Sequence, residues 1–322
     1  MSSVDARVAE FDLIARIRAR VPGRGDVVLG IGDDAALLQP PPGMQLAVAM
    51  DTLNAGVHFP PETAPADIGW KALAVNLSDL AAMGAAPAWC TLSLSLPDGD
   101  AGFVDGFLDG FLQLAAQHEV ALVGGDTTRG PLSVCVTAHG FVEPGTALRR
   151  DGARVGDDVW VSGTLGDAAG ALAQWQAGQA IDAGLRLRLD RPTPRVALGC
   201  ALRGIATACI DVSDGLLADL SHACTASGVG ARIEVDALPA SESLQACFSP
   251  EQRRILQAAG GDDYELCFTA PADAREAVLQ ASAAAGVPVR RIGRVDAALG
   301  VTACAADGSA WSAPAAGWIH FA

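Results

Sequence analysis

Acidic residues recur in this chain where short apolar runs end, and carboxylates in such positions can hold metal ions. The five stretches are GIGDD at 30–34, MDT at 50–52, NLSD at 76–79, GGDTT at 124–128 and IDVSDG at 210–215. In open α/β sheets, ligands gather beyond the carboxyl ends of strands, so we expect these stretches to converge. Clustered carboxylates raise one another's pKa values. Mg²⁺, which takes oxygen ligands, would relieve that repulsion and mediate contact with a phosphate.

Each stretch also has a purely structural interpretation. A single Gly-Asp pair is commonly a turn or a helix N-cap, because Asp accepts hydrogen bonds from free N–H groups and Gly adopts positive φ. Asp211 and Asp214 bracket a strand-to-helix turn whose N–H groups could hold a phosphate, and the alternative there is a cap with Ser213 as N-cap. In GGDDYE at 260–265 the acidic pair precedes a strand, and a hairpin turn is the alternative.

The basic residues limit how the chain could bind a nucleotide. Lys71 is the only lysine, and the Gly-x-x-x-x-Gly-Lys-Ser/Thr loop is absent, so nucleotide phosphates would need another binding device. Lys71 follows Asp67 by four residues, a spacing that favours an ion pair on a helix face. His58 and Trp318 are isolated, and taken alone each has a structural role as its simplest interpretation.

Composition excludes several classes of protein. The 322 residues carry a net charge of −15, from 37 acidic and 22 basic side chains. Such a charge repels nucleic acid and anionic membranes, so we expect neither as a partner. Eight cysteines without a Cys-x-x-Cys pair indicate buried thiols in a reducing compartment. With no signal-peptide pattern and no apolar run of about 18 residues, the expected location is the cytoplasm.

The elements that must position these residues form two mixed α/β units. Hydrophobic periodicity predicts helices at 4–20, 66–83 and 101–118, and apolar runs predict strands at 27–31, 46–50, 89–96, 121–123 and 132–141. After a boundary at 142–145, strands are predicted at 159–162, 208–212, 264–269 and 289–292. Helices are predicted there at 167–177, 195–202, 216–227, 253–259 and 272–285. The expected domains are 1–145 and 146–322.

Six stretches resemble the thiamine-monophosphate kinase family in order and spacing: GIGDDAA (30–36), DTLNAGVHF (51–59), WKALAVNLSDLAAMG (70–84), GGDTTRG (124–130), IDVSDGLL (210–217) and GGDDYELCFT (260–269). The resemblance covers about residues 10–322. That family belongs to the aminoimidazole ribonucleotide synthetase-like superfamily. The resemblance therefore implies an N-terminal dimerising α/β domain and a C-terminal α/β domain, with ATP in a cleft between them.

The resemblance also implies an activity and roles for individual residues. The activity is ATP- and Mg²⁺-dependent, in-line phosphorylation of thiamine monophosphate to thiamine diphosphate by a homodimer, as the last step of thiamine diphosphate biosynthesis. The implied metal ligands are Asp34, Met50, Asp51, Asp79, Asp126, Asp211 and Asp214, of which Asp126, Asp211 and Asp214 are the implied catalytic residues. The implied nucleotide contacts are Gly125, Asp126, Arg150 and Ser213. The implied substrate contacts are His58, Asp262 and Trp318, with the aromatic ring stacked on the vitamin's cationic ring.

Two positions depart from the family pattern. Ala49-Met50 stands where the family often has Ser-Thr, so only backbone carbonyls remain there as metal ligands. Asp262 stands where the family usually has Glu, and the shorter side chain would reach the substrate less well or through water.

Two alternatives to this function remain open. One is another member of the superfamily, such as a selenophosphate synthetase or a purine-pathway ligase. A selenophosphate synthetase would carry a reactive cysteine near a Gly-rich N-terminal segment, whereas the first cysteine here is Cys90. The other is a non-catalytic acidic protein that binds divalent cations, which would bind metal without turning over ATP.

Overall fold

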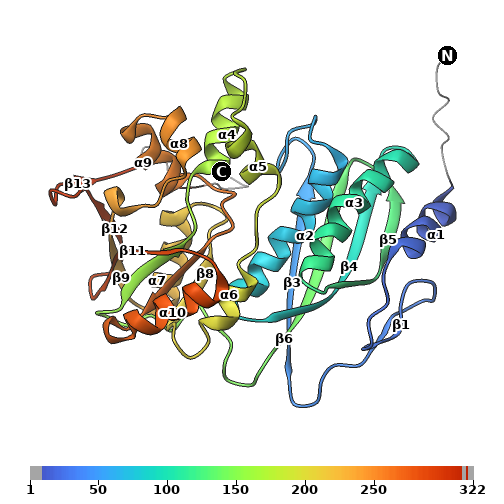
Figure 1. Ribbon diagram of the computed structural model, residues 1–322, viewed down its shortest axis with the longest axis horizontal. Helices are drawn as coiled ribbons and strands as arrows, with labels where there is room; N and C mark the ends of the chain where they lie inside the picture. Colours follow the sequence, from blue (N-terminus) through green and yellow to red (C-terminus); the bar gives the residue numbers. More distant parts are fainter. Residues whose placement is uncertain (1–8, 314–316, 318–322) are drawn as a thin grey trace. The chain divides into compact units, whose positions relative to one another are not determined.

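The computed structural model describes residues 9–313 and 317, and it divides into two compact units (Figure 1). Unit 1 takes in the chain up to Leu80 together with Ala86–Pro144, and unit 2 takes in Ala81–Ala85 and the chain from Gly145 onward. No helix in the described part of the chain is long and apolar enough to cross a membrane.

Unit 1 is built on a four-stranded sheet with the order β3-β6-β4-β5. Its strands are β3 (Gln45–Asn54), β4 (Ala86–Leu96), β5 (Ala121–Arg129) and β6 (Ser133–Val142), and its helices are α1 (Glu10–Arg20), α2 (Pro65–Ala82) and α3 (Ala101–Gln117). A separate ribbon pairs β1 (Val27–Leu29) with β2 (Leu37–Leu38). β4 and β5 are parallel, whereas β6 is antiparallel to both β3 and β4.

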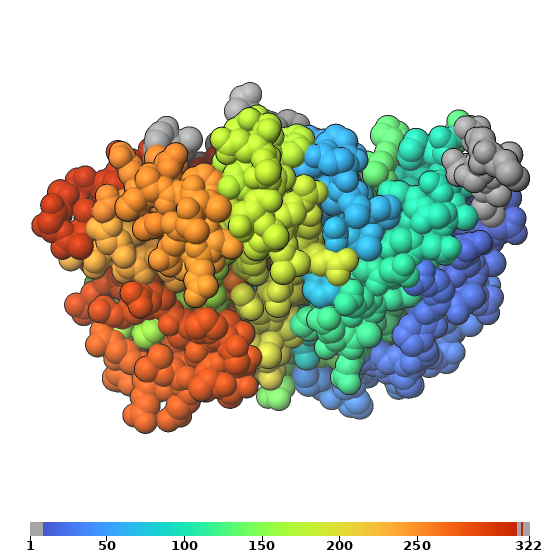
Figure 2. Space-filling model, turned by 45° about the horizontal axis from the view of Figure 1, so that its top comes forward, coloured from blue at the N-terminus to red at the C-terminus, as the bar shows by residue number. Residues whose placement is uncertain are grey.

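Helices α2 and α3 lie side by side against one face of this sheet, and their side chains are in direct contact (Figures 1 and 2). Glycines make the approach possible, because a Cβ atom on Gly69 would lie 2.0 Å from the Phe107 carbonyl oxygen. A Cβ atom on Gly110 would lie 1.7 Å from the carbonyl oxygen of Ala66. The two helix backbones therefore touch at two points where no side chain fits.

Unit 2 is built on a seven-stranded sheet with the order β13-β12-β9-β11-β7-β10-β8. Its strands are β7 (Asp158–Ser162), β8 (Ala208–Asp211), β9 (Gly230–Glu234), β10 (Leu266–Ala270), β11 (Val289–Asp296), β12 (Gly300–Cys304) and β13 (Ala310–Trp311). Its helices are α4 (Asp167–Gln176), α5 (Ala183–Asp190), α6 (Val196–Ala201), α7 (Leu216–Ser227), α8 (Glu242–Cys247), α9 (Pro250–Ala259) and α10 (Arg275–Ala285), with short 3₁₀ turns η1 (Val235–Ala237) and η2 (Ala272–Ala274). β9 and β12 are parallel, and the other neighbours are antiparallel.

The predicted mixed α/β class is confirmed, but two strands are longer than predicted. β3 extends to Asn54 and β5 extends to Arg129, so Asp51 and Asp126 lie inside strands and not beyond their ends. Backbone pairing with β6 and β4 continues past the last apolar residue, because the ladder depends on main-chain hydrogen bonds. Most neighbouring strands are antiparallel, so neither sheet has a single carboxyl edge, and the convergence of the five acidic stretches stays a prediction.

Candidate metal and nucleotide site

The turn from β8 into α7 is the most sharply defined part of the candidate site. Asp211 ends β8 and is buried, and Gly215 precedes α7 with a φ of 122°. The N–H groups of Ser213, Asp214 and Gly215 all donate to one oxygen, Oδ2 of Asp219, over 3.0, 3.0 and 3.1 Å. The alternative of a cap at Ser213 is therefore wrong, because Gly215 is the N-cap residue and Asp219 accepts the N–H groups of the turn.

Asp219 occupies the position where the sequence suggested a bound phosphate. It lies in the first turn of α7, its side chain is buried, and its carboxylate already takes up all three N–H groups of the turn. Burial, followed by the charges of Asp211 and Asp214, raises the pKa of Asp219 from 3.8 to about 7. The turn is thus held by an internal carboxyl group, and Asp211 and Asp214 lie beside it.

The loop at 260–265 packs directly on this turn. The N–H of Asp262 donates to the Ser213 carbonyl oxygen over 2.9 Å, and that of Tyr264 donates to the Val212 carbonyl oxygen over 2.8 Å. A Cβ atom on Gly261 would lie 2.5 Å from the Ser213 carbonyl oxygen, so only glycine allows this approach. The loop joins α9 to β10, so the hairpin turn considered from the sequence is wrong. Asp262 and Ser213 are brought together as neighbours.

Two residues of this loop have left-handed backbone conformations that glycine would adopt more readily. The φ angles are 67° at Asp262 and 51° at Tyr264, and the Tyr264 hydroxyl donates to Oδ1 of Asp262 over 3.1 Å. Such conformations persist where the surroundings fix them. Here the main-chain bonds to the 212–213 segment and this hydroxyl contact fix the direction of the Asp262 carboxylate.

A buried ionic network supports the same loop. Glu265 is fully buried; it accepts from Ser162 Oγ at 2.5 Å, from Arg188 Nη2 at 2.7 Å and from Arg195 Nε at 2.7 Å. Asp263, also buried, accepts from the Gly166 N–H through both oxygens, and burial raises its pKa well above the ordinary value. The sequence analysis assigned no role to these residues, because the partners lie far apart in the chain.

Two further residues of unit 2, Arg150 and Trp318, are implied for the site. Arg150 is exposed on a segment that runs beside β8, where the Cys209 N–H donates to the Arg149 carbonyl oxygen over 2.9 Å. Trp318 lies outside the described residues. Its neighbour Gly317 is described, and a Cβ atom there would lie 2.8 Å from the Asp214 carbonyl oxygen.

In unit 1, a buried asparagine contacts one implied ligand and lies on the same helix as another. The Asp51 N–H on β3 donates to Oδ1 of Asn76 over 3.0 Å, and Asn76 is fully buried in α2, where its Nδ2 donates to the Ala72 carbonyl oxygen. Asp79 follows Asn76 by three residues on the same helix, so both project from one side of α2. Asp51 is half-buried, and burial raises its pKa.

Asp126 lies on β5, at the opposite edge of the sheet from β3. The preceding Gly125 has a φ of 153°, and a Cβ atom there would lie 1.8 Å from the Leu92 carbonyl oxygen. Glycine is therefore required for the close approach of β5 to β4. Asp126 itself is exposed, so it is accessible to a ligand.

The other unit 1 residues implied for the site lie in turns or on the exposed edge of β3. Asp34 is exposed, and its N–H donates to Oδ1 of Asp33 over 2.9 Å. The His58 Nδ1 accepts from the Asn54 N–H over 3.0 Å, and its carbonyl oxygen accepts from Nζ of the buried Lys71 over 3.0 Å. Lys71 therefore lies in the interior, and the ion pair with Asp67 that its spacing favours stays a prediction. Met50 is 63% exposed.

The described part of the chain contains no group of three or more His, Cys, Asp or Glu side chains placed to share a metal ion. Ser213, Asp214 and Asp262 do come together, with Asp211 at the start of the same turn. The shared metal site that draws on both units stays a prediction.

Two family profiles match the chain: AIR synthase related protein, N-terminal domain, over residues 32–142, and AIR synthase related protein, C-terminal domain, over residues 154–303. The thiamine-monophosphate kinase of Escherichia coli (strain K12) is 48% identical over 319 residues, which cover 97% of this chain and 98% of the relative.

Solved structures show the same similarity. The crystal structure of thiamine-monophosphate kinase from Stenotrophomonas maltophilia K279a has 57% identity and a TM-score of 0.87, covering 94% of this chain and 98% of that one. AaThiL complexed with AMPPCP and TMP has 32% identity and a TM-score of 0.77, covering 99% and 100%. The chain therefore belongs to the thiamine-monophosphate kinase family, which shares the two domains of the AIR synthase related proteins.

Proposed function

We propose that the protein transfers the γ-phosphoryl group of ATP to thiamine monophosphate, giving ADP and thiamine diphosphate in the last step of thiamine diphosphate biosynthesis. The observation that carries this proposal is similarity over almost the whole chain to thiamine-monophosphate kinases. The relative solved with AMPPCP and TMP supports the same pair of substrates. The phosphate groups of both small molecules are anionic, and the chain is itself strongly acidic.

The residues of the 211–215 turn suit a magnesium ion. Asp211 and Asp214 supply hard oxygen ligands, and their charges add to burial in raising the pKa of the neighbouring Asp219. We therefore propose that Asp211 and Asp214, together with Asp34, Asp51, Asp79, Asp126 and the Met50 carbonyl, hold Mg²⁺. When bound, Mg²⁺ would neutralise the phosphate charges of both substrates.

The chemistry needs no general base. The nucleophile is an oxygen of the substrate's phosphate monoester, whose second pKa is about 6, so this oxygen is largely ionised at neutral pH. An alcohol nucleophile would have to lose a proton during attack, and this one does not. The protein's part is to orient the two phosphates for in-line transfer. In this proposal Gly125, Arg150 and Ser213 contact the nucleotide, and His58, Asp262 and Trp318 contact thiamine monophosphate.

An assay that follows both products tests the activity directly. Purified protein is mixed with ATP, MgCl₂ and thiamine monophosphate, and both ADP and thiamine diphosphate are followed by chromatography. We expect equal amounts of the two products. Metal binding without ATP turnover would favour the non-catalytic alternative. ATP hydrolysis at a rate that does not depend on thiamine monophosphate would favour a different member of the superfamily.

We also propose that the protein is a homodimer that uses the sheet of unit 1. Leu46, Val48 and Met50 alternate along the edge strand β3 and share one face, and they are 51%, 57% and 63% exposed. A row of exposed apolar side chains on a sheet face is typical of an interface, and a second copy presents the same row. Sedimentation equilibrium should give the mass of a dimer, and Val48→Glu should give a monomer.

The proposed location is the cytoplasm. All eight cysteines are free thiols in the structure, which suits a reducing compartment. Only four of them are buried, so the predicted burial holds for half of the cysteines. A fluorescent-protein fusion of the full chain that distributed outside the cytoplasm would contradict this location.

A further inference from the structure

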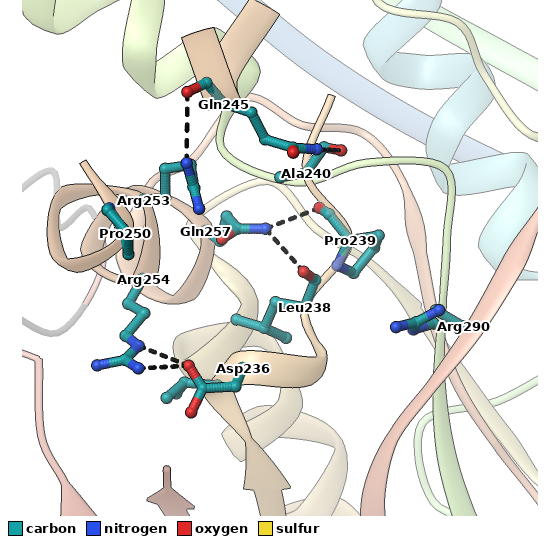
Figure 3. Close-up of a pocket in the computed structure, with 11 residues that line it drawn as sticks. Asp236, Leu238, Pro239, Ala240, Gln245, Pro250, Arg253, Arg254, Gln257 and Arg290 are labelled. Carbon is teal, nitrogen blue, oxygen red and sulfur yellow. Dashed lines mark hydrogen bonds and ion pairs between the residues drawn. The ribbon is translucent and has the colours of Figure 1, made fainter. Parts of the chain in front are cut away.

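Unit 2 contains a cavity whose lining residues include none from the 211–215 turn or the 260–265 loop. Its volume is about 390 Å³, within the range of small-molecule sites. It lies where the chain leaves β9 through η1 and passes to α8 and α9, and Arg290 of β11 lies across it from the arginines of α9 (Figure 3). The proposed kinase reaction gives this cavity no role.

Positive charge dominates the lining of this cavity. Arg253, Arg254 and Arg290 line it, whereas Asp236 is the acidic residue among the lining residues. The Arg254 Nε donates to Oδ1 of Asp236 over 2.7 Å, so these two charges cancel. Within the described part of the chain, Arg253 and Arg290 have no carboxylate partner, although the whole sequence carries 37 acidic against 22 basic side chains. A net charge of about two positive units therefore faces the cavity.

The backbone acceptors of the wall are already occupied. Nε2 of the buried Gln257 donates to the carbonyl oxygens of Leu238 and Pro239 over 3.1 and 2.8 Å, and Nε2 of Gln245 donates to that of Ala240 over 3.1 Å (Figure 3). These bonds offset the carbonyl partial charges that would otherwise repel an anion. They also fix the wall, because Gln257 is only 3% exposed.

The guanidinium groups keep donors for a ligand. Nη1 of Arg253 donates to the carbonyl oxygens of Gln245 and Phe248 over 3.4 and 3.2 Å, which positions the group and leaves its other N–H groups available. Arg290 is exposed, and all of its N–H groups are available within the described structure. Two arginines on opposite sides of one cavity suit phosphate oxygens, which guanidinium groups bind through paired hydrogen bonds.

We propose that this cavity is a second ligand site, which binds a small organic phosphate of about mononucleotide size. Arg253 and Arg290 bind the phosphate, and the apolar surface of Leu238, Pro239 and Pro250 accepts the organic group. The site is independent of the proposed catalytic reaction, since it needs no divalent cation.

The probe for this site is AMP, titrated by calorimetry into the full chain at low salt with excess EDTA. Removing metal suppresses phosphate binding at the acidic site, so the arginine site is measured alone. We expect a dissociation constant near or below about 1 mM, and Arg290→Gln should raise it about tenfold. Arg232→Gln is the matched control, because Arg232 is exposed on the neighbouring strand β9 and does not line the cavity.

Asp236→Asn provides a test that distinguishes the proposal from misfolding, because the expected result is tighter binding. It releases Arg254 and removes the one opposing charge, while its Oδ1 can still accept a hydrogen bond, so AMP should bind several-fold more tightly. Equal losses in Arg290→Gln and Arg232→Gln, or weaker binding by Asp236→Asn, would overturn the proposal. Inorganic phosphate should bind more weakly than AMP, and equal affinities would refute the role of the apolar surface.

Discussion

Replacing Asp219 by asparagine tests how the turn before α7 is held. In the folded protein the pKa of Asp219 is about 7, whereas the carboxyl titrates near 3.8 in the unfolded chain. Between these two pH values the folded state binds more protons than the unfolded state, so the free energy of unfolding falls as pH rises. At about 1.4 kcal/mol for each pH unit, the loss amounts to ~4 kcal/mol and is complete above pH 7.

Asparagine has no proton to lose at this position, and its Oδ1 can accept the same three N–H bonds. We expect the free energy of unfolding of Asp219→Asn, relative to wild type, to rise by ~4 kcal/mol between pH 4 and pH 8. Urea unfolding in EDTA, followed by tryptophan fluorescence, measures this difference. Asp219→Ala is the control; it leaves three N–H groups unpaired and should be less stable than the asparagine variant at every pH. A difference that does not change with pH, or that shrinks as pH rises, would refute the reasoning.

Three further predictions concern the proposed reaction and the network behind it. Asp214→Asn should weaken Mg²⁺ affinity and lower kcat, with partial recovery at high Mg²⁺ or Mn²⁺, and full turnover after exhaustive chelation would contradict the metal requirement. Trp318→Ala should raise the KM for thiamine monophosphate and leave that for ATP nearly unchanged, and steady-state kinetics that show equal rises would place Trp318 elsewhere. Glu265→Ala should lower the free energy of unfolding by about 3–5 kcal/mol in urea titrations, because it leaves the partly buried Arg188 and Arg195 without their fully buried carboxylate. A loss below about 1 kcal/mol would show that the network does not stabilise unit 2.

Local patterns in the sequence predicted the helices and strands well, because periodicity and turn residues act over a few positions. They failed where polar residues continue a strand, as at Asp51 and Asp126, since hydrogen bonding to a neighbouring strand extends the ladder. The leading helix was predicted from residue 4, and the described helix begins at Glu10. Helix α5 was missed because its leucines alternate with arginines, a period of two that does not indicate a helix. Helix α8 and strands β2, β9, β12 and β13 were not predicted either.

The sequence predicted the acidic motifs of the candidate site, but it did not predict the residues that hold these motifs in place. Asp211 and Asp214 could be picked out because they lie together in one short stretch. Asp219 accepts the N–H groups of the turn only once α7 forms, and the sequence does not show which oxygen would accept them. Glu265 meets Arg188 and Arg195 from 77 and 70 residues away, a separation that no periodicity reveals.

The backbone contact between α2 and α3 has a consequence for anyone who engineers this enzyme for heat resistance. Exchanging a helical glycine for alanine is a standard stabilising choice, worth about 1 kcal/mol in an exposed helix. At Gly69 and Gly110 the same exchange would push the helices apart, because the added methyl group would overlap a carbonyl oxygen. Since α2 carries Asn76 and Asp79, the displacement would reach Asp79, a proposed metal ligand, without any change to that residue. A thermostability library should therefore exclude these two positions.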